Sequence, residues 1–143
     1  MSSLSMMCLS GELAKVREAI VRGENVNDKS FYGDTPLMLA LSKKHNSIVK
    51  ILLEQPTLDL NSIQPWMKRT ALHIAAMFDN VQGARLLLAD PRLNTQNHKD
   101  ILRDTPVMTA MHHKSVNALR ELVAHPSVDL EHGRTLEDFA RWL

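Results

Sequence analysis

The chain repeats itself at a fixed interval of 35 residues. A six-residue block that opens with threonine occurs at Thr35–Ala40, Thr70–Ala75 and Thr105–Ala110. The threonines are separated by 70 − 35 = 35 and 105 − 70 = 35 residues. A leucine-rich block follows in the same phase, at Ile48–Leu53, Gly83–Leu88 and Ala118–Val123. A period of about 20 to 50 residues is typical of proteins in which small units stack into an elongated array.

Each unit is predicted to contain a helix, a turn, a second helix and an extended loop. Thr35 and Thr105 each precede a proline, which is typical of a helix start: threonine caps the first turn, and proline occupies a position that needs no N–H bond. The second block has leucines at i, i+3 and i+4, which predicts an apolar stripe. Pro56, Pro91 and Pro126 then end this helix. Neither helix buries its stripe alone, so we expect the units to stack.

The threonine blocks resemble the ankyrin repeat. The resemblance rests on Thr-Pro-Leu-x-x-Ala at 35–40, Thr-Ala-Leu-His-x-Ala at 70–75 and Thr-Pro-Val-x-x-Ala at 105–110. It implies an all-α ankyrin repeat solenoid of stacked helix-turn-helix units joined by β-hairpin-like loops, with about four repeats and a short C-terminal cap. We expect one domain over 1–143, divided into an N-terminal capping repeat at 1–28, repeats at 29–63, 64–98 and 99–132, and a partial C-terminal cap at 133–143.

The hairpins depart from the family pattern at one position. Ankyrin hairpins usually carry glycine just before the threonine block, and Gly33 supplies it in the second unit. Lys68 and Arg103 occupy the equivalent positions. Because glycine tolerates a positive φ at no steric cost, we expect the tips at Lys68 and Arg103 to be less regular.

The resemblance also implies where a partner binds. Partners of ankyrin proteins use the hairpin tips and the ends of the first helices, which line the concave side of the stack. Carried over by position, the partner-binding residues are Phe31, Tyr32, Asp34, Lys43, Trp66, Met67, Arg69, Met77, Phe78, Ile101, Leu102, Asp104, His112 and His113. We call ten of them the contact band: Phe31-Tyr32, Trp66-Met67, Met77-Phe78, Ile101-Leu102 and His112-His113.

Large apolar residues occupy both tip positions of each hairpin, which is unusual for loops that meet water. Contiguous exposed apolar residues indicate an interface, and we expect Trp66, Met77 and Phe78 to anchor a hydrophobic partner. Two alternatives stay open. Alternation along an extended loop turns about half of the six tip residues inward, and a self-complementary apolar face predicts a homodimer.

The charge balance argues against nucleic acid as the partner. The chain has 17 Lys and Arg against 16 Asp and Glu, a net charge of +1, whereas nucleic-acid binders concentrate a basic excess. No apolar run reaches the roughly 18 residues of a membrane span, and the start lacks the features of a signal peptide. The single cysteine, Cys8, is interpreted as a small buried side chain. We expect an intracellular protein, in the cytoplasm or the nucleus, without membrane insertion.

No motif has the spacing of a catalytic or metal site. His112 and His113 are adjacent, so on a helix they point about 100° apart and do not form a metal pair. By the resemblance, His73 is a structural histidine that hydrogen-bonds the adjacent turn. No glycine-rich phosphate loop or nucleophile motif occurs, so we predict no cofactor, no metal and no enzyme activity. Asn27 and Asn61 resemble loop asparagines that an oxygenase hydroxylates in some ankyrin proteins.

These observations predict a non-catalytic scaffold that binds a partner protein or peptide through the concave face and the hairpin tips. The alternative is an ankyrin targeting or regulatory domain of a larger protein whose enzymatic or channel activity lies outside this chain. The sequence ends at Leu143, where a last helix is expected to continue, and this leaves room for a C-terminal partner domain.

Overall fold

The computed structural model describes residues 3–130, and within this range the chain forms eight helices and no strand. They are α1 (Ser3–Ser10), α2 (Leu13–Val21), α3 (Pro36–Ser42), α4 (Asn46–Leu53), α5 (Ala71–Met77), α6 (Val81–Ala89), α7 (Pro106–His112) and α8 (Val116–Ala124). Each predicted repeat from 1–28 to 99–132 contains one helix pair, although the division at these boundaries stays a prediction. The predicted cap at 133–143 lies outside the described residues.

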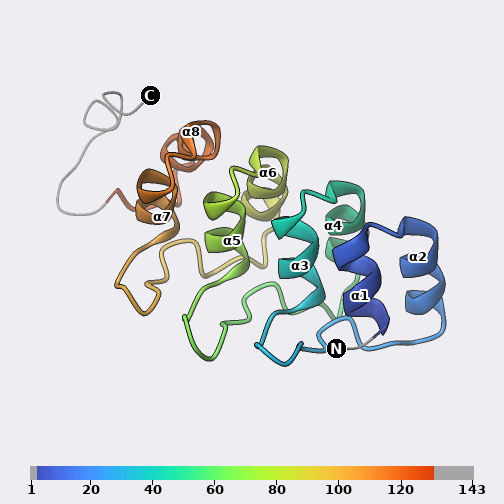
Figure 1. Ribbon diagram of the computed structural model, residues 1–143. Helices are drawn as coiled ribbons and strands as arrows, with labels where there is room; N and C mark the ends of the chain where they lie inside the picture. Colours follow the sequence, from blue (N-terminus) through green and yellow to red (C-terminus); the bar gives the residue numbers. More distant parts are fainter. Residues whose placement is uncertain (1–2, 131–143) are drawn as a thin grey trace.

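The helices form two rows. Figure 1 shows α1, α3, α5 and α7 in one row and α2, α4, α6 and α8 in the other, with the long loops along one edge. Each helix packs against its neighbours in its own row and against its partner in the other row. The predicted all-helical solenoid of stacked helix-turn-helix units is therefore confirmed.

The threonines of the repeated blocks cap the first helix of their units, as predicted. The hydroxyl of Thr35 accepts the Met38 N–H at 3.2 Å, and that of Thr105 accepts the Met108 N–H at 3.4 Å. Pro36 and Pro106 occupy the first helical position after them. All three threonines are buried, because the helices start beneath the loops.

Residues at equivalent positions of successive units fill the core between the rows. The leucines and alanines that recur with the repeat are almost completely buried: Leu37, Leu72, Ala40, Ala75, Ala110, Leu52, Leu87 and Leu122. Cys8 lies in the same core, which confirms its interpretation as a buried side chain. Burial raises the pKa of the Cys8 thiol to about 12, so the thiol is protonated at neutral pH.

The hairpin tips correct one prediction. Gly33, Lys68 and Arg103 all adopt a positive φ, of 82°, 55° and 66°. The tip at Arg103 closes with the same two backbone bonds as the glycine tip, so the expected irregularity there is wrong. The tip at Lys68 does differ, because Pro65 has no N–H to donate; the Gln64 N–H donates to the Arg69 carbonyl oxygen instead, at 2.9 Å.

Replacing Lys68 or Arg103 by glycine is expected to stabilise the chain by about 0.5 to 1 kcal/mol each. A non-glycine residue at positive φ is strained by about 1 to 3 kcal/mol, and the added freedom of glycine in the unfolded chain offsets part of the relief. Urea denaturation measures the change. Lys29→Gly is the control, because Lys29 does not itself have a positive φ, and this variant should lose stability. A loss in all three variants contradicts the assignment of strain.

A polar side chain at an equivalent place in each of three loops fastens successive units together. The Asn61 side-chain amide donates to the Arg92 carbonyl oxygen at 2.9 Å, and its oxygen accepts the Asn94 N–H at 2.9 Å. Asn27 and Asn97 make the same pair of bonds, to residues 57 and 59 and to residues 127 and 129. Asn97, which the sequence did not single out, therefore belongs to the same set as the predicted Asn27 and Asn61.

Candidate partner-binding surface

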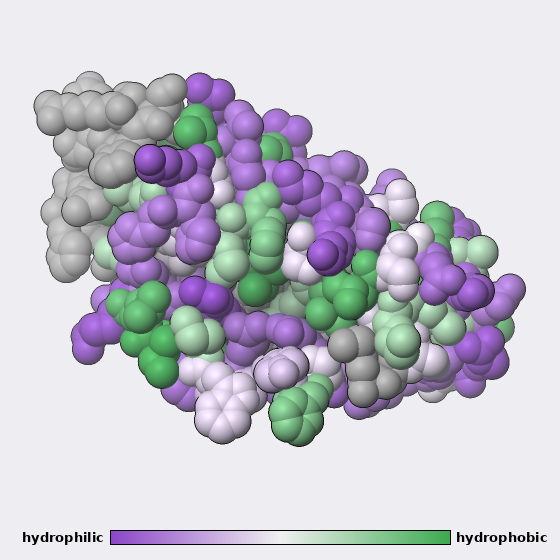
Figure 2. All heavy atoms as spheres, in the orientation of Figure 1, coloured by the Kyte–Doolittle hydropathy of each residue, from purple (hydrophilic) through white to green (hydrophobic). Residues whose placement is uncertain are grey.

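The hairpin tips present their large side chains to solvent. Five of the six tip residues are between 54% and 90% exposed, and only Met67 is half-buried. The alternation that turns about half of them inward does not occur, because the tips are tight turns closed at their bases and not extended strands. Figure 2 shows the result as green and white spheres along the edge where the long loops lie in Figure 1.

Short-range contacts hold the exposed tips in place. The Ser30 N–H donates to the Asp34 carbonyl oxygen at 2.8 Å, and the Asp100 N–H makes the equivalent bond to Asp104 at 2.9 Å. The rings of Phe31 and Tyr32 meet edge to face with centroids 5.3 Å apart. The Ile101 N–H donates to the Met67 carbonyl oxygen at 2.9 Å and so links two neighbouring tips. The apolar side chains are thus presented on an ordered support.

A groove of about 280 Å³ lies between α3 and α5 on the same side as the tips, and we call it the central groove. The buried side chains of Met38, Leu39 and Ile74 form its base. Met77 and Phe78 line it at the C-terminal end of α5. The lining also includes four predicted binding residues from two tips and α5: Asp34, Arg69, Met77 and Phe78. The structure therefore brings these four residues to one site, with the predicted Lys43 beside the lining residue Ser42.

The tip end of the central groove is polar. The Gln64 side-chain amide donates to the Asp34 carboxylate across the two hairpins. Arg69 Nε lies 3.7 Å from the buried Asp100 carboxylate and has no hydrogen-bond partner within the described part of the chain. Asp100 already accepts the N–H groups of Leu102 and Asp104, both at 2.9 Å. The Arg69 guanidinium is therefore held at the groove by an acid that is already hydrogen-bonded elsewhere.

Three predicted binding residues of the last described unit are engaged with their own surroundings. His112 Nδ1 lies 2.9 Å from the Asp104 carboxylate, which is only 14% exposed. His113 Nδ1 lies 3.0 Å from the Thr109 carbonyl oxygen. Both imidazoles stay exposed, so they can contact a partner with one ring nitrogen already bonded.

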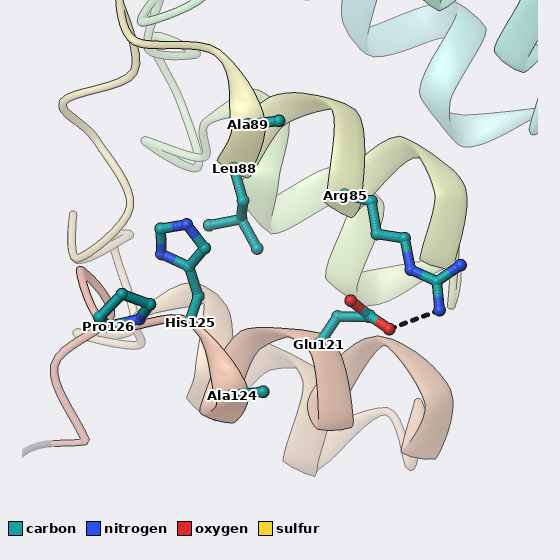
Figure 3. Close-up of a pocket in the computed structure, with 7 residues that line it drawn as sticks. All are labelled: Arg85, Leu88, Ala89, Glu121, Ala124, His125 and Pro126. Carbon is teal, nitrogen blue, oxygen red and sulfur yellow. Dashed lines mark hydrogen bonds and ion pairs between the residues drawn. The ribbon is translucent and has the colours of Figure 1, made fainter.

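A second groove, of about 250 Å³, lies on the opposite face between α6 and α8 (Figure 3). Its charged groups pair with each other, since Arg85 and Glu121 form an ion pair of 2.6 Å that lowers the pKa of the Glu121 carboxyl. His125 Nδ1 is bonded to the Ser127 hydroxyl at 2.8 Å. None of the predicted binding residues lines it.

Comparison with known families identifies the fold. The family described as "Ankyrin repeats (3 copies)" matches residues 4–97. This chain belongs to the ankyrin repeat family. Ankyrin repeats are in general protein-interaction modules and are generally non-catalytic, which agrees with the coarse function that the sequence predicts.

Three ankyrin-containing relatives are much longer than this chain. Inversin from Gallus gallus is 30% identical over 125 residues, which are 87% of this chain and 11% of that protein. The BTB/POZ domain-containing protein 1 from Schizosaccharomyces pombe is 37% identical over 76 residues, 52% of this chain and 6% of that protein. The human transient receptor potential cation channel subfamily A member 1 is 31% identical over 77 residues, 54% of this chain and 7% of that protein.

The histidine of the third ankyrin unit has the structural role that the sequence predicts. His73 is completely buried; its Nδ1 accepts the Thr70 N–H at 3.2 Å, and its Nε2–H donates to the Asp104 carbonyl oxygen at 2.8 Å. Across residues 3–130, no group of three or more His, Cys, Asp or Glu side chains is placed to hold a metal ion. In the same range, no helix combines the length and the apolar character that crossing a membrane requires.

Proposed function

We propose that this ankyrin chain is a non-catalytic module that holds a partner protein or peptide against the contact band and the central groove. The observation that carries the proposal is the exposure of five large tip side chains on an ordered support beside the groove. Buried aromatic anchors provide most of the binding energy in protein interfaces, and Trp66 and Phe78 are placed to become buried when a partner binds. The groove supplies a recess beside Phe78 for an apolar side chain of the partner.

The alternative is a targeting or regulatory domain within a larger protein. It is supported by relatives of which this chain covers between 6% and 11%, one of them named as a cation channel subunit. In this case too, the contact band binds a partner. That binding positions the activity that another part of the longer protein carries.

The double substitution Trp66→Ser/Phe78→Ser is expected to abolish partner binding and leave the fold intact. Each lost aromatic anchor weakens an interface by about 2 kcal/mol, which is about thirtyfold in Kd. Affinity purification from cell extract with quantitative mass spectrometry, run beside circular dichroism, measures both. Val21→Ser is the control, because Val21 is 87% exposed on α2, away from the contact band. Equal capture by wild type and double variant contradicts the proposal, and loss of the helical signal would show that the two side chains support the core.

A second copy of the chain is the alternative occupant of the contact band. Light scattering over a dilution series distinguishes it from a foreign partner, because a homodimer formed through the tips dissociates in the Trp66→Ser/Phe78→Ser variant and stays intact in Val21→Ser. A monomer at every concentration rejects the homodimer.

A further inference from the structure

Exposed acids are unevenly distributed between the two sides of the stack. Seven exposed cations lie in the tip loops and in the turns between paired helices. One is Lys99, and we call the other six the basic rim: Lys29, Lys43, Lys44, Lys68, Arg103 and Lys114. Over the same segments only one acid, Asp28, is exposed. The tip cations lie at one end of the first helices and the turn cations lie at the other, so the basic rim flanks the central groove from both ends.

The second helices, on the opposite side, carry both signs of charge. Arg17 and Lys50 are exposed there, and other cations pair with acids. Lys15 pairs with Glu12 at 2.8 Å, and Arg85 pairs with Glu121 at 2.6 Å. Glu18 and Glu54 are exposed there as well. By contrast, none of the ion pairs found within residues 3–130 includes a residue of the basic rim. The net charge of +1 therefore hides an uneven distribution of exposed acids. The side with the basic rim has Asp28, and the rest of the described chain has Glu18, Glu54, Asp59 and Asp129.

Acids at the groove itself do not cancel this charge. The Asp34 carboxylate accepts the Gln64 amide, and the Asp104 carboxylate is bonded to His112. Asp100 is only 5% exposed and lies beside Arg69. The surface that faces a partner thus combines apolar side chains, a groove with an arginine at its tip end, and unpaired lysines around it.

We propose that the occupant of this surface is an acidic segment of a partner protein, in which apolar side chains are interspersed with aspartate or glutamate. The inference rests on the proposed function and adds the chemistry of the partner. An apolar side chain of the segment enters the central groove above Met38 and Ile74, and neighbouring carboxylates lie against Lys68, Arg103 and Arg69. Like-charge repulsion from the basic rim disfavours a basic segment, and charge complementarity speeds the encounter with an acidic one.

The apolar content of the surface favours a protein segment over nucleic acid. Single-stranded nucleic acid binds where successive aromatic rings give stacking faces beside the cations. Exposed rings occur at Phe31, Tyr32, Trp66 and Phe78, but the tip at Ile101 and Leu102 and the groove base at Met38, Leu39 and Ile74 are aliphatic or sulfur-containing. The rings are therefore not continued by a stacking face at these positions. These side chains match apolar anchors of a peptide.

Selection of random dodecapeptides displayed on phage, against the full chain, tests the inference. The bait is the wild type or one of two charge-reversed variants, Lys68→Glu/Arg103→Glu on the rim and Arg17→Glu/Lys50→Glu on α2 and α4. Each variant changes the net charge from +1 to 1 − 4 = −3, so the pair differs only in where the charge lies. Enriched peptides are then synthesised, and their Kd for each bait and for the Trp66→Ser/Phe78→Ser variant is measured by fluorescence anisotropy. Circular dichroism confirms the fold of each protein.

The expected peptides contain Asp or Glu in excess of Lys and Arg, together with aromatic or aliphatic residues. Their affinity should fall about tenfold or more on Lys68→Glu/Arg103→Glu, stay within about twofold on Arg17→Glu/Lys50→Glu, and weaken between about 0.1 M and about 0.5 M salt. Enrichment of neutral or basic peptides that require Trp66 and Phe78 overturns the acidic chemistry and leaves the proposed function standing. Absence of any peptide that requires Trp66 and Phe78 overturns both. Tighter binding of oligouridine or of anionic vesicles than of any selected peptide overturns the inference in favour of that ligand.

Discussion

Replacing Asn80 by alanine is expected to lower the free energy of unfolding by about 3 kcal/mol or more. Asn80 is 1% exposed, and its side-chain oxygen accepts the Gly83 N–H at 2.9 Å as the cap of α6. Its amide nitrogen donates to the Leu41 carbonyl oxygen at the end of α3, at 3.0 Å. A reciprocal pair of amide bonds, both 2.9 Å, joins it to Asn46. Alanine leaves a buried donor and a buried acceptor without partners, each worth about 1 to 3 kcal/mol.

Urea denaturation followed by circular dichroism measures this loss. Asn117→Ala is the matched control, because its exposed amide makes one bond of 3.2 Å to Asp79 and its removal should change stability by less than about 0.5 kcal/mol. Asn80→Asp keeps the side-chain volume but removes both N–H donors and places a carboxylate beside the Leu41 carbonyl oxygen. It should be at least as damaging as alanine, and a mild effect of Asn80→Asp would show that volume, not hydrogen bonding, is what the site needs.

The period of 35 residues is sufficient to predict the architecture. Residues that make the same contacts in every unit recur at this interval. Thr35 and Thr105 were predicted to cap helices and do so, and the recurring leucines and alanines fill the core. The role of His73 also follows from its place in the repeated block. These residues are identical or similar from one unit to the next, so the sequence displays them as a pattern.

Asn80 belongs to a set of equivalent side chains that bridge successive units. The sequence does not reveal this set, because its members differ in residue type. His45, Asn80 and Ser115 are equivalent, and each side chain reaches a carbonyl oxygen at the end of the preceding unit's first helix, those of Leu9, Leu41 and Met77. A histidine, an asparagine and a serine share no motif, and the acceptor is main chain, which leaves no trace in the sequence.

The candidate surface was predicted by position and not by geometry. The tip residues follow from their positions in the repeat, but the alternative in which about half of them turn inward, as in an extended strand, does not occur. The sequence also does not show that the side chains of Arg69 and Asp104 already have partners. The partner of Arg69 is Asp100, which is distant in sequence, and the partner of Asp104 is His112, which belongs to α7. The exposure and pairing of these side chains depend on how hairpins of different units meet. At Pro65, for example, the hydrogen bond that closes the hairpin moves to the N–H of Gln64. The sequence of a single unit does not contain that information.

Acidification from about pH 7 to about pH 5 is expected to destabilise the chain through His73. Burial lowers the pKa of the His73 imidazole in the folded state, and His98 and Arg69 lower it further. The Asp104 carbonyl and the Asp100 carboxylate oppose the shift without reversing it. In the unfolded chain the pKa returns to about 6.5, so below that pH the unfolded state binds more protons. The contribution is therefore complete above about pH 6.5 and is lost as the pH falls through the lowered pKa of the folded state.

His73→Ala separates this effect from general acid denaturation. At neutral pH it should cost about 2 to 4 kcal/mol, because the buried Thr70 N–H and the Asp104 carbonyl oxygen lose their partner. It should also flatten the dependence of stability on pH between about 7 and 5, where carboxyls with lowered pKa, such as those of Asp90 and Glu121, stay ionised in both states. His113→Ala, which removes an exposed imidazole, should keep the wild-type slope. Parallel slopes for wild type and His73→Ala in urea titrations at each pH would assign the acid sensitivity to groups other than the buried histidine.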